Sequence, residues 1–368
     1  MNSKIMIPWA KPVYWGKEKE YVMDALESTW ISGGSYIDKF ENACRNFLNA
    51  PFCLVVSNGT TALNLALLCL GIKPGDEVII PGFGFMAAAN ISIQMGAIPK
   101  YAEVDADTWC IDPGSISDLI TPETKIIIPI HTYGNVCDMD EINELAKSHE
   151  LFVVEDAAES LGSRYKDHFS GGISDIGVYS FHATKTITTG EGGLVSTNNS
   201  DFFNKMRLLR SHGMWRNKHY WHDAIGHNFR LTNLQAALGL GQIEFIKPIL
   251  EKKRAVYKKY QSRLSNVDGL KFQLIKNEVN PIIWAVAMQL SDEAFPQGRD
   301  EVMSEMMEAG IETRPGFYTP SEMKALYETT PLPVSEKISR EVISLPSFPS
   351  LADDEIDYIC SSLLKCKK

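Results

Sequence analysis

The sequence of 368 residues lacks features of several protein classes. Its seven cysteines form an odd count with no Cys-x-x-Cys pair, which argues against a disulfide framework and indicates reduced core residues. No run approaches the ~18 apolar residues of a membrane span, and residues 1–8 lack the apolar stretch of a signal peptide. We therefore expect a cytoplasmic protein with no membrane contact, and we expect no metal site.

Positive charge is also scarce, because 36 Lys and Arg stand against 46 Asp and Glu and give a net charge of -10. Nucleic-acid affinity rests on clustered Lys and Arg that neutralise phosphates, so the composition excludes a general nucleic-acid binder. A ligand that carries phosphate must then be small and held by a few local cations. Internal repeats and low-complexity segments are absent as well.

The remaining composition is that of an ordinary globular protein, with 44% hydrophobic and 22% charged residues, 26 Gly and 18 Pro. These proportions exclude a collagenous, coiled-coil or disordered chain. The length allows one large domain and a smaller one.

Short apolar runs alternate with helix-like stretches between about residue 50 and residue 200. The patterns predict strands at 53–56, 77–80, 99–104, 125–130 and 151–154, and helices at 61–70, 87–95 and 138–148. This alternation predicts an α/β fold with a mostly parallel sheet that helices cover on both faces. Ligands of such sheets bind at the carboxyl ends of the strands.

The pattern changes after residue 233. It predicts one long helix at 233–266, a strand at 282–288 and a helix at 299–309 that Gly310 ends. A charged run at 251–254 is interpreted as a solvated helix face. We expect a large α/β domain at 1–245 and a smaller α+β domain at 246–368.

Three segments could carry chemistry. Segment 57–61 (SNGTT) joins a strand to a helix and would seat a phosphate or simply cap the helix. Asp156 ends a buried strand, where a carboxylate needs a cationic partner unless it caps the next segment. Lys185 follows a strand among small and hydroxyl-bearing residues, where a lysine sheltered from water could form a Schiff base, whereas most lysines are solvated surface charges.

Together, a phosphate seat, a strand-end carboxylate and a sheltered lysine match the needs of pyridoxal phosphate. The order and spacing of the motifs then show a resemblance over nearly the whole chain. Segments 28–33 (STWISG), 57–60 (SNGT), 155–159 (EDAAE), 180–185 (SFHATK) and 226–232 (GHNFRLT) resemble the DegT/DnrJ/EryC1/StrS family of nucleotide-sugar aminotransferases. That family belongs to the fold-type I pyridoxal phosphate enzymes, whose large domain contains a seven-stranded sheet.

The resemblance implies roles for individual residues. Lys185 matches the lysine that attaches to the cofactor, and Asp156 matches the carboxylate that keeps its ring nitrogen protonated. The other cofactor contacts that the resemblance implies are Gly59, Thr60 and Ser180 at the phosphate, Phe85 on the ring, and Glu159 beside the cofactor. Phe85 has plain core packing as its alternative.

The same resemblance implies partners. Asn228 matches an asparagine that reaches the cofactor phosphate of the neighbouring subunit, which implies a homodimer with shared active sites. The positions that would contact the sugar nucleotide are Trp30, Ile31, Ser32, Arg314, Pro315, Gly316 and Phe317. Among these, Arg314 is the first candidate for the diphosphate, since the acidic chain has few cations to offer.

The implied reaction moves an amino group from an amino acid, most often L-glutamate in this family, to a keto sugar linked to a nucleoside diphosphate. A 4-keto-6-deoxy sugar is the expected acceptor, in amino-sugar and surface polysaccharide biosynthesis such as that of the lipopolysaccharide O-antigen. A 3-keto sugar is the alternative, and the residues leave the nucleotide and the product epimer open.

An alternative of another class comes from segment 82–87 (GFGFMA). It fits a loose dinucleotide-binding fingerprint, with Asp105 about 20 positions further on, and would make the protein an NAD-dependent oxidoreductase. This interpretation leaves Lys185, Asp156 and Asn228 without roles.

Overall fold

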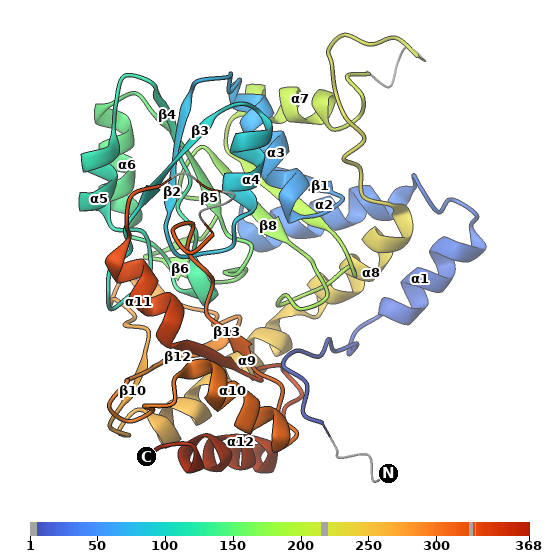
Figure 1. Cartoon of the computed structure of the whole chain (residues 1–368). Coiled ribbons are helices and arrows are strands. Elements are labelled where there is room, and N and C mark those ends of the chain that lie inside the picture. Colours follow the sequence, from blue (N-terminus) through green and yellow to red (C-terminus); the bar gives the residue numbers. More distant parts are fainter. Residues whose placement is uncertain (1–5, 215–219, 324–326, 328) are drawn as a thin grey trace.

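The larger of the two main sheets has seven strands in the order β1-β9-β8-β5-β4-β2-β3 (Figure 1). The structure is a computed structural model that describes residues 6–214, 220–323, 327 and 329–368. The strands of this sheet are β1 (Phe52–Val56), β2 (Glu77–Pro81), β3 (Ile98–Ala102), β4 (Thr124–Ile127), β5 (Phe152–Asp156), β8 (Ile176–Ser180) and β9 (Gly193–Thr197). β9 runs antiparallel to β1 and β8 and the other pairs in this sheet are parallel, so the predicted mostly parallel sheet is confirmed.

Helices cover both faces of this sheet. Successive strand residues point to opposite faces, and apolar residues on each face pack against helices. Leu54 and Val56 face the core formed with α3 (Gly59–Leu70), α4 (Ala87–Gln94) and α7 (Ser200–Leu209). Cys53 and Val55 face α2 (Ser35–Leu48) and α8 (Asn233–Glu244). The same side carries α5 (Pro113–Leu119) and α6 (Met139–Ser148), and α1 (Glu18–Glu27) packs on α8.

Strand register brings three chain segments to one edge of the sheet. Val56 and Ser180 both pair with Gly193, from opposite sides of β9. Asp156 at the end of β5 pairs with Val178 of β8. The carboxyl ends of β1, β5 and β8 therefore meet at the edge where ligands of parallel sheets bind.

The second sheet contains four antiparallel strands in the order β10-β12-β14-β13. They are β10 (Leu270–Phe272), β12 (Val286–Leu290), β14 (Val342–Leu345) and β13 (Arg314–Pro315), and their core includes α9 (Ile246–Leu264), α10 (Arg299–Glu308) and α12 (Asp353–Lys365). Shorter elements are η1 (Thr132–Gly134), α11 (Pro333–Glu341) and a small sheet of β11 (Val279–Asn280), β6 (Arg164–Tyr165) and β7 (His168–Phe169).

The strands predicted at 99–104 and 125–130 end earlier, at Ala102 and Ile127, and two further elements differ more from their prediction. The predicted helix at 233–266 is two helices, which Phe245 separates. Pro248 explains the break, since its ring would clash with the carbonyl of Glu244 in a continuous helix, whereas the first turn of α9 tolerates it. The predicted strand at 282–288 begins only at Val286, because the Trp284 N–H donates to the Tyr133 carbonyl instead of to a strand.

We propose that the domains divide at Phe245, between α8 and α9. The N-terminal segment adds to the second unit, because Ile7 lies in its core and forms a bridge with Ile311. Val13, six residues later, already lies in a core of the large sheet.

The loose dinucleotide fingerprint does not form a ligand-binding turn. A Cβ on Gly82 would lie 2.6 Å from the Leu332 side chain, so protein atoms occupy the space that a pyrophosphate would need. Phe83 is fully buried, and the Asp105 carboxylate accepts backbone N–H groups of its own turn, including that of Thr108. The oxidoreductase interpretation therefore has no site here.

Across the part of the chain that the structure describes, no helix combines the length and the apolar character that a membrane crossing requires. The same residues contain no group of three or more His, Cys, Asp or Glu side chains that could hold a metal ion.

Gly177 in β8 yields a prediction about stability. A Cβ at this position would lie 1.9 Å from the carbonyl oxygen of Gly171. We expect Gly177→Ala to lower the free energy of unfolding by about 3 kcal/mol, because overpacking against backbone cannot relax. Thermal denaturation measures the change. Gly33→Ala is the matched control, since nothing lies within 4 Å of its added Cβ, and equal melting temperatures for the two variants would contradict this packing.

Candidate active site

The predicted phosphate-binding segment lies where β1 meets α3. Asn58 caps the helix: its Oδ1 accepts the Thr61 N–H at 2.8 Å, and the Thr61 hydroxyl oxygen accepts the Asn58 N–H at 3.1 Å. The N–H groups of Gly59 and Thr60 have no acceptor within the helix and lie at the positive end of its dipole. A Cβ on Gly59 would lie 3.1 Å from the Ser180 Cβ, so the structure brings these two predicted residues together.

Asp156 ends β5 and is 5% exposed. Its Oδ1 accepts the Ala158 N–H at 3.0 Å, and it forms no ion pair with any described residue. Burial raises the pKa of Asp156, while the Ala158 hydrogen bond and the positive charge of Lys185 oppose this shift. The site therefore contains a buried carboxylate that is open to a cationic partner.

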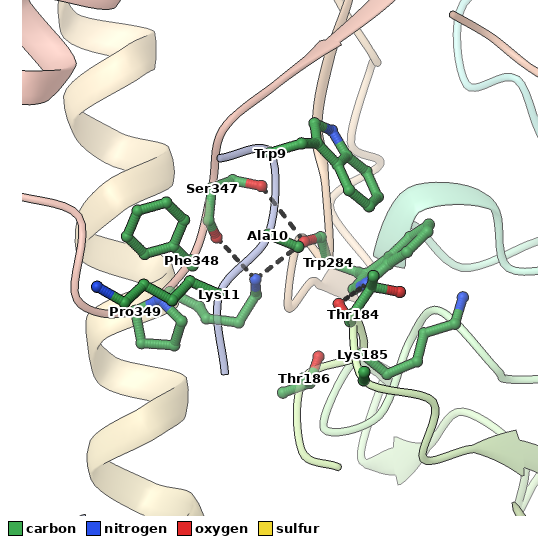
Figure 2. Close-up of a pocket in the computed structure, with 12 residues that line it drawn as sticks. Trp9, Ala10, Lys11, Thr184, Lys185, Thr186, Trp284, Ser347, Phe348 and Pro349 are labelled. Carbon is green, nitrogen blue, oxygen red and sulfur yellow. Dashed lines mark hydrogen bonds between the residues drawn. The ribbon is translucent and has the colours of Figure 1, made fainter. Parts of the chain in front are cut away.

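Lys185 lies in the loop after β8, close enough for its charge to act on Asp156. Figure 2 shows its side chain beside Trp284. Its side chain is 14% exposed, and its Nζ lies 3.4 Å from Glu159 Oε1. The same Nζ lies 3.6 Å from the centroid of the Trp284 ring. The lysine is thus sheltered, and it contacts both an acid and an aromatic face.

Glu159 is held by a strained backbone. Its Oε2 accepts the Tyr133 N–H at 2.8 Å. Tyr133 has φ of 58°, in the left-handed region that costs a bulky residue on the order of 1–3 kcal/mol. Burial raises the pKa of Glu159, and the nearby Lys185 lowers it. The strain therefore directs a backbone donor at the acid beside Lys185.

A row of rings, here called the aromatic wall, consists of Phe85, Phe317, Tyr133, Trp284 and Trp9. Phe317 stacks on Tyr133 with centroids 5.2 Å apart, and Tyr133 stacks on Trp284 at 6.4 Å. Phe85 meets Phe317 edge-on at 6.4 Å, and Trp9 meets Trp284 edge-on at 5.4 Å. Phe85 is 62% exposed, so core packing does not account for it.

The predicted substrate segment in the second unit adjoins this wall. Arg314 lies 5.8 Å over the ring of Trp9, and its guanidinium pairs with the Glu312 carboxylate. Gly316 follows β13 and connects it to Phe317 of the wall. A substrate diphosphate at Arg314 would compete with Glu312 for the same cation.

The other predicted substrate residues form the loop between α1 and α2. Asn233 of α8 holds this loop through its Nδ2, which donates to the Trp30 carbonyl at 2.6 Å, and its N–H, which donates to the Ser32 carbonyl at 3.0 Å. Trp30 is 69% exposed and Ile31 48%. No hydrogen bond or ring contact among the described residues joins the loop to Lys185.

Asn228 is exposed and accepts the Arg230 Nε–H at 3.0 Å. The carbonyl of its neighbour Phe229 accepts the Ser57 N–H at 2.9 Å. This segment therefore runs beside the predicted phosphate seat of its own chain, with the Asn228 side chain at the surface.

A model of the DegT/DnrJ/EryC1/StrS aminotransferase family matches residues 15–364. The chain belongs to this family.

Relatives in sequence and structure agree with this assignment. The GDP-perosamine synthase of Escherichia coli O157:H7 is 41% identical over 97% of each chain, and that of Caulobacter vibrioides is 38% identical over 99% of each. The aminotransferase PseC of Helicobacter pylori, involved in pseudoaminic acid biosynthesis, superposes with a TM-score of 0.92 at 28% identity, over 98% of this chain and 99% of that one.

The residues present fit the pyridoxal phosphate of this aminotransferase family. Asp156 is a buried carboxylate with no ion-pair partner among the described residues, so it is available to pair with a protonated ring nitrogen of the cofactor. Gly59 leaves room beside Ser180 that a side chain would fill. Lys185 supplies the amine. A structure from Streptococcus pneumoniae that is described as a sugar aminotransferase, 27% identical over 98% of this chain and 97% of that one with a TM-score of 0.92, is a PMP form.

Sequence reasoning missed Trp284 and Lys253. Trp284 was hidden inside an apolar run that predicts a strand. The interpretation of the run at 251–254 as a solvated face holds for Glu251 and Lys252, which are exposed, and is wrong for Lys253, which is 5% exposed. It lies on the buried stripe of α9 with Ile249, Val256 and Tyr260, and this helical spacing was the available signal.

A second missed group is the buried pair of His131 and Glu155. His131 Nε2 lies 3.1 Å from Glu155 Oε2, while His131 Nδ1 accepts the Cys137 N–H at 3.3 Å. The proton of the neutral ring is therefore assigned to Nε2, facing Glu155. The backbone N–H of His131 donates to the Asp156 carbonyl at 3.0 Å, so the segment between β4 and η1 is tied to the end of β5.

Burial lowers the pKa of Lys253 from 10.5 to about 7, and this shift predicts a pH dependence of stability. The unfolded chain binds more protons than the folded chain between these values, so stability rises with pH across this window. Relative to Lys253→Met, the natural protein should gain about 2 kcal/mol of unfolding free energy from pH 7 to pH 9. Denaturant titrations of both proteins at each pH measure the difference, and a difference that stays constant would contradict the assignment.

Proposed function

We propose that this chain is a pyridoxal phosphate-dependent aminotransferase that moves the amino group of L-glutamate to a GDP-linked 4-keto-6-deoxy sugar. The observation that carries the proposal is the meeting of Lys185, Asp156 and the Gly59–Ser180 contact at one edge of the sheet. The GDP-perosamine synthases at 41% and 38% identity support the choice of nucleotide. The product would serve the synthesis of surface polysaccharide.

Pyridoxal phosphate supplies an aldehyde for an amine and a ring that withdraws electrons. Lys185 would attach to this aldehyde, and its Nζ, once free, would take the proton from the α-carbon of the donor. Asp156 would face the ring nitrogen and keep a proton on it. Glu159 lies 3.4 Å from the lysine amine and would hold that amine near the reacting carbon.

The remaining predicted residues would bind phosphate, ring and substrate. The amides of Gly59 and Thr60 and the hydroxyl of Ser180 would hold the cofactor phosphate, and the exposed ring of Phe85 would stack on the cofactor. Arg314 would hold the substrate diphosphate. We propose the cytoplasm as the compartment, because all seven cysteines are buried and free.

The function is tested with a panel of sugar nucleotides. We expect amino transfer to GDP-linked 4-keto sugars to be at least about tenfold more efficient than to UDP- or dTDP-linked or 3-keto sugars, since a mismatched base leaves polar groups unpaired. Borohydride should fix a pyridoxyl group on Lys185, as mass spectrometry would show.

Lys185→Ala should lose amino transfer and keep its melting temperature, because the side chain has no core role. Lys166→Ala, at an exposed lysine away from the site, is the matched control. Unchanged turnover in Lys185→Ala would refute the role of the lysine, and efficient transfer only to 3-keto sugars would refute the choice of substrate.

We further propose a homodimer with shared active sites. Exposed apolar side chains support it, including Ile225 at 92% exposure, three residues before Asn228, and Trp30 at 69% exposure in the loop between α1 and α2. Asn228 would reach the cofactor phosphate of the partner.

Mixing two inactive variants tests the sharing of sites. Each mixed dimer of Lys185→Ala and Asn228→Ala would contain one site with both residues intact. We expect an equal mixture, refolded together, to regain about a quarter of the natural activity, given strong loss in each variant alone. Light scattering gives the oligomeric state. A dimer without regained activity would show that each chain completes its own site.

A further inference from the structure

Trp284 contacts the reactive amine and the backbone next to it. Its indole face lies 3.6 Å from Lys185 Nζ, and its Nε1 donates to the carbonyl of Thr184 at 2.7 Å. The side chain is 8% exposed. One residue therefore fixes both the loop that carries the lysine and one contact of the lysine amine (Figure 2).

The backbone of Trp284 is itself fixed on both sides. Its N–H donates to the Tyr133 carbonyl at 2.9 Å. Its carbonyl oxygen accepts Lys253 Nζ at 2.9 Å and the Ser347 hydroxyl at 3.4 Å. Trp284 is therefore tied to η1 through Tyr133 and to the second unit through Lys253 and Ser347.

Lys253 joins the backbone of Trp284 to that of Ser347. Its Nζ also donates to the Ser347 carbonyl at 3.0 Å, and no carboxylate of the described residues pairs with it. Two carbonyl acceptors can be satisfied by the ammonium or by the neutral amine, since both have at least two N–H donors. A buried lysine that holds only two backbone oxygens acts as a clamp on those oxygens.

We propose that Trp284 is a positioning residue for Lys185 and that Lys253 clamps Trp284 in place from α9. A lysine side chain is flexible and samples many rotamers, so an amine that must meet one carbon needs contacts that restrict it. The indole face attracts the charged amine and leaves its N–H groups free for Glu159. The inference rests on the proposed role of Lys185 and holds for any sugar acceptor.

The first test measures the amine without turnover. The full chain, freed of bound aldehyde with hydroxylamine, is acetylated with limiting acetic anhydride, and mass spectrometry compares Lys185 with the exposed Lys252. We expect Trp284→Leu to raise the relative labelling of Lys185 by about threefold, because the amine loses its aromatic contact. Trp284→Phe, which keeps an aromatic face, should stay within about twofold of the natural protein.

Lys253→Met should also raise the labelling of Lys185, by about twofold, since Trp284 loses its clamp. Lys252→Met is the matched control on the neighbouring exposed position, with labelling compared to Lys247 in both proteins. Labelling of Lys253 in the Trp284 variants reports general unfolding, which would expose both buried lysines together. If Trp284→Leu does not fold, Lys253→Met carries the test.

The second test uses the loaded enzyme. Trp284→Leu should slow the donor half-reaction about tenfold and leave the KM of the sugar nucleotide within about twofold, with recovery in Trp284→Phe. Unchanged Lys185 labelling in Trp284→Leu, or equal losses in the Leu and Phe variants, would overturn the proposal. Labelling as expected in a chain that aminates no sugar would instead overturn the proposed function and leave this inference intact.

Discussion

The role proposed for Lys185 requires a primary amine that is held in a nearly dry site and can still leave its contacts, and the site around Lys185 meets this constraint. The 3.4 Å separation from Glu159 is longer than a strong charge-assisted hydrogen bond, and the second contact is a ring face. Each holding group is fixed in turn, Glu159 by the strained Tyr133 N–H and Trp284 by Lys253. The contacts that hold this one amine therefore extend from η1 to α9.

The large sheet makes this arrangement possible through its register. Gly193 of the antiparallel strand β9 lies between Val56 and Ser180, so the start of α3 and the loop after β8 emerge side by side. Asp156 emerges from the next parallel strand with the buried His131–Glu155 pair beneath it. The pairing of the strands therefore determines which polar groups become neighbours at their carboxyl ends.

Sequence patterns predicted the parts of the fold that follow from periodicity, including the strands near Val55, Ile79 and Val153. They failed at the break near Phe245 because the apolar spacing of α8 and α9 continues across it and only Pro248 marks it. Trp284 could not be predicted, since its role depends on a contact with Lys185, about a hundred positions away in the chain. The buried Lys253 looked like surface charge because local composition outweighed its place on an apolar stripe.

The chain passes between the two sheets more than once. It leaves the core of the second sheet after Ile7 and joins one core of the large sheet by Val13. It returns through Phe245, later places Leu332 in the core on the other face of the large sheet, and rejoins the second sheet at Ile343. A movement of one unit against the other would therefore have to bend the chain at each of these crossings together.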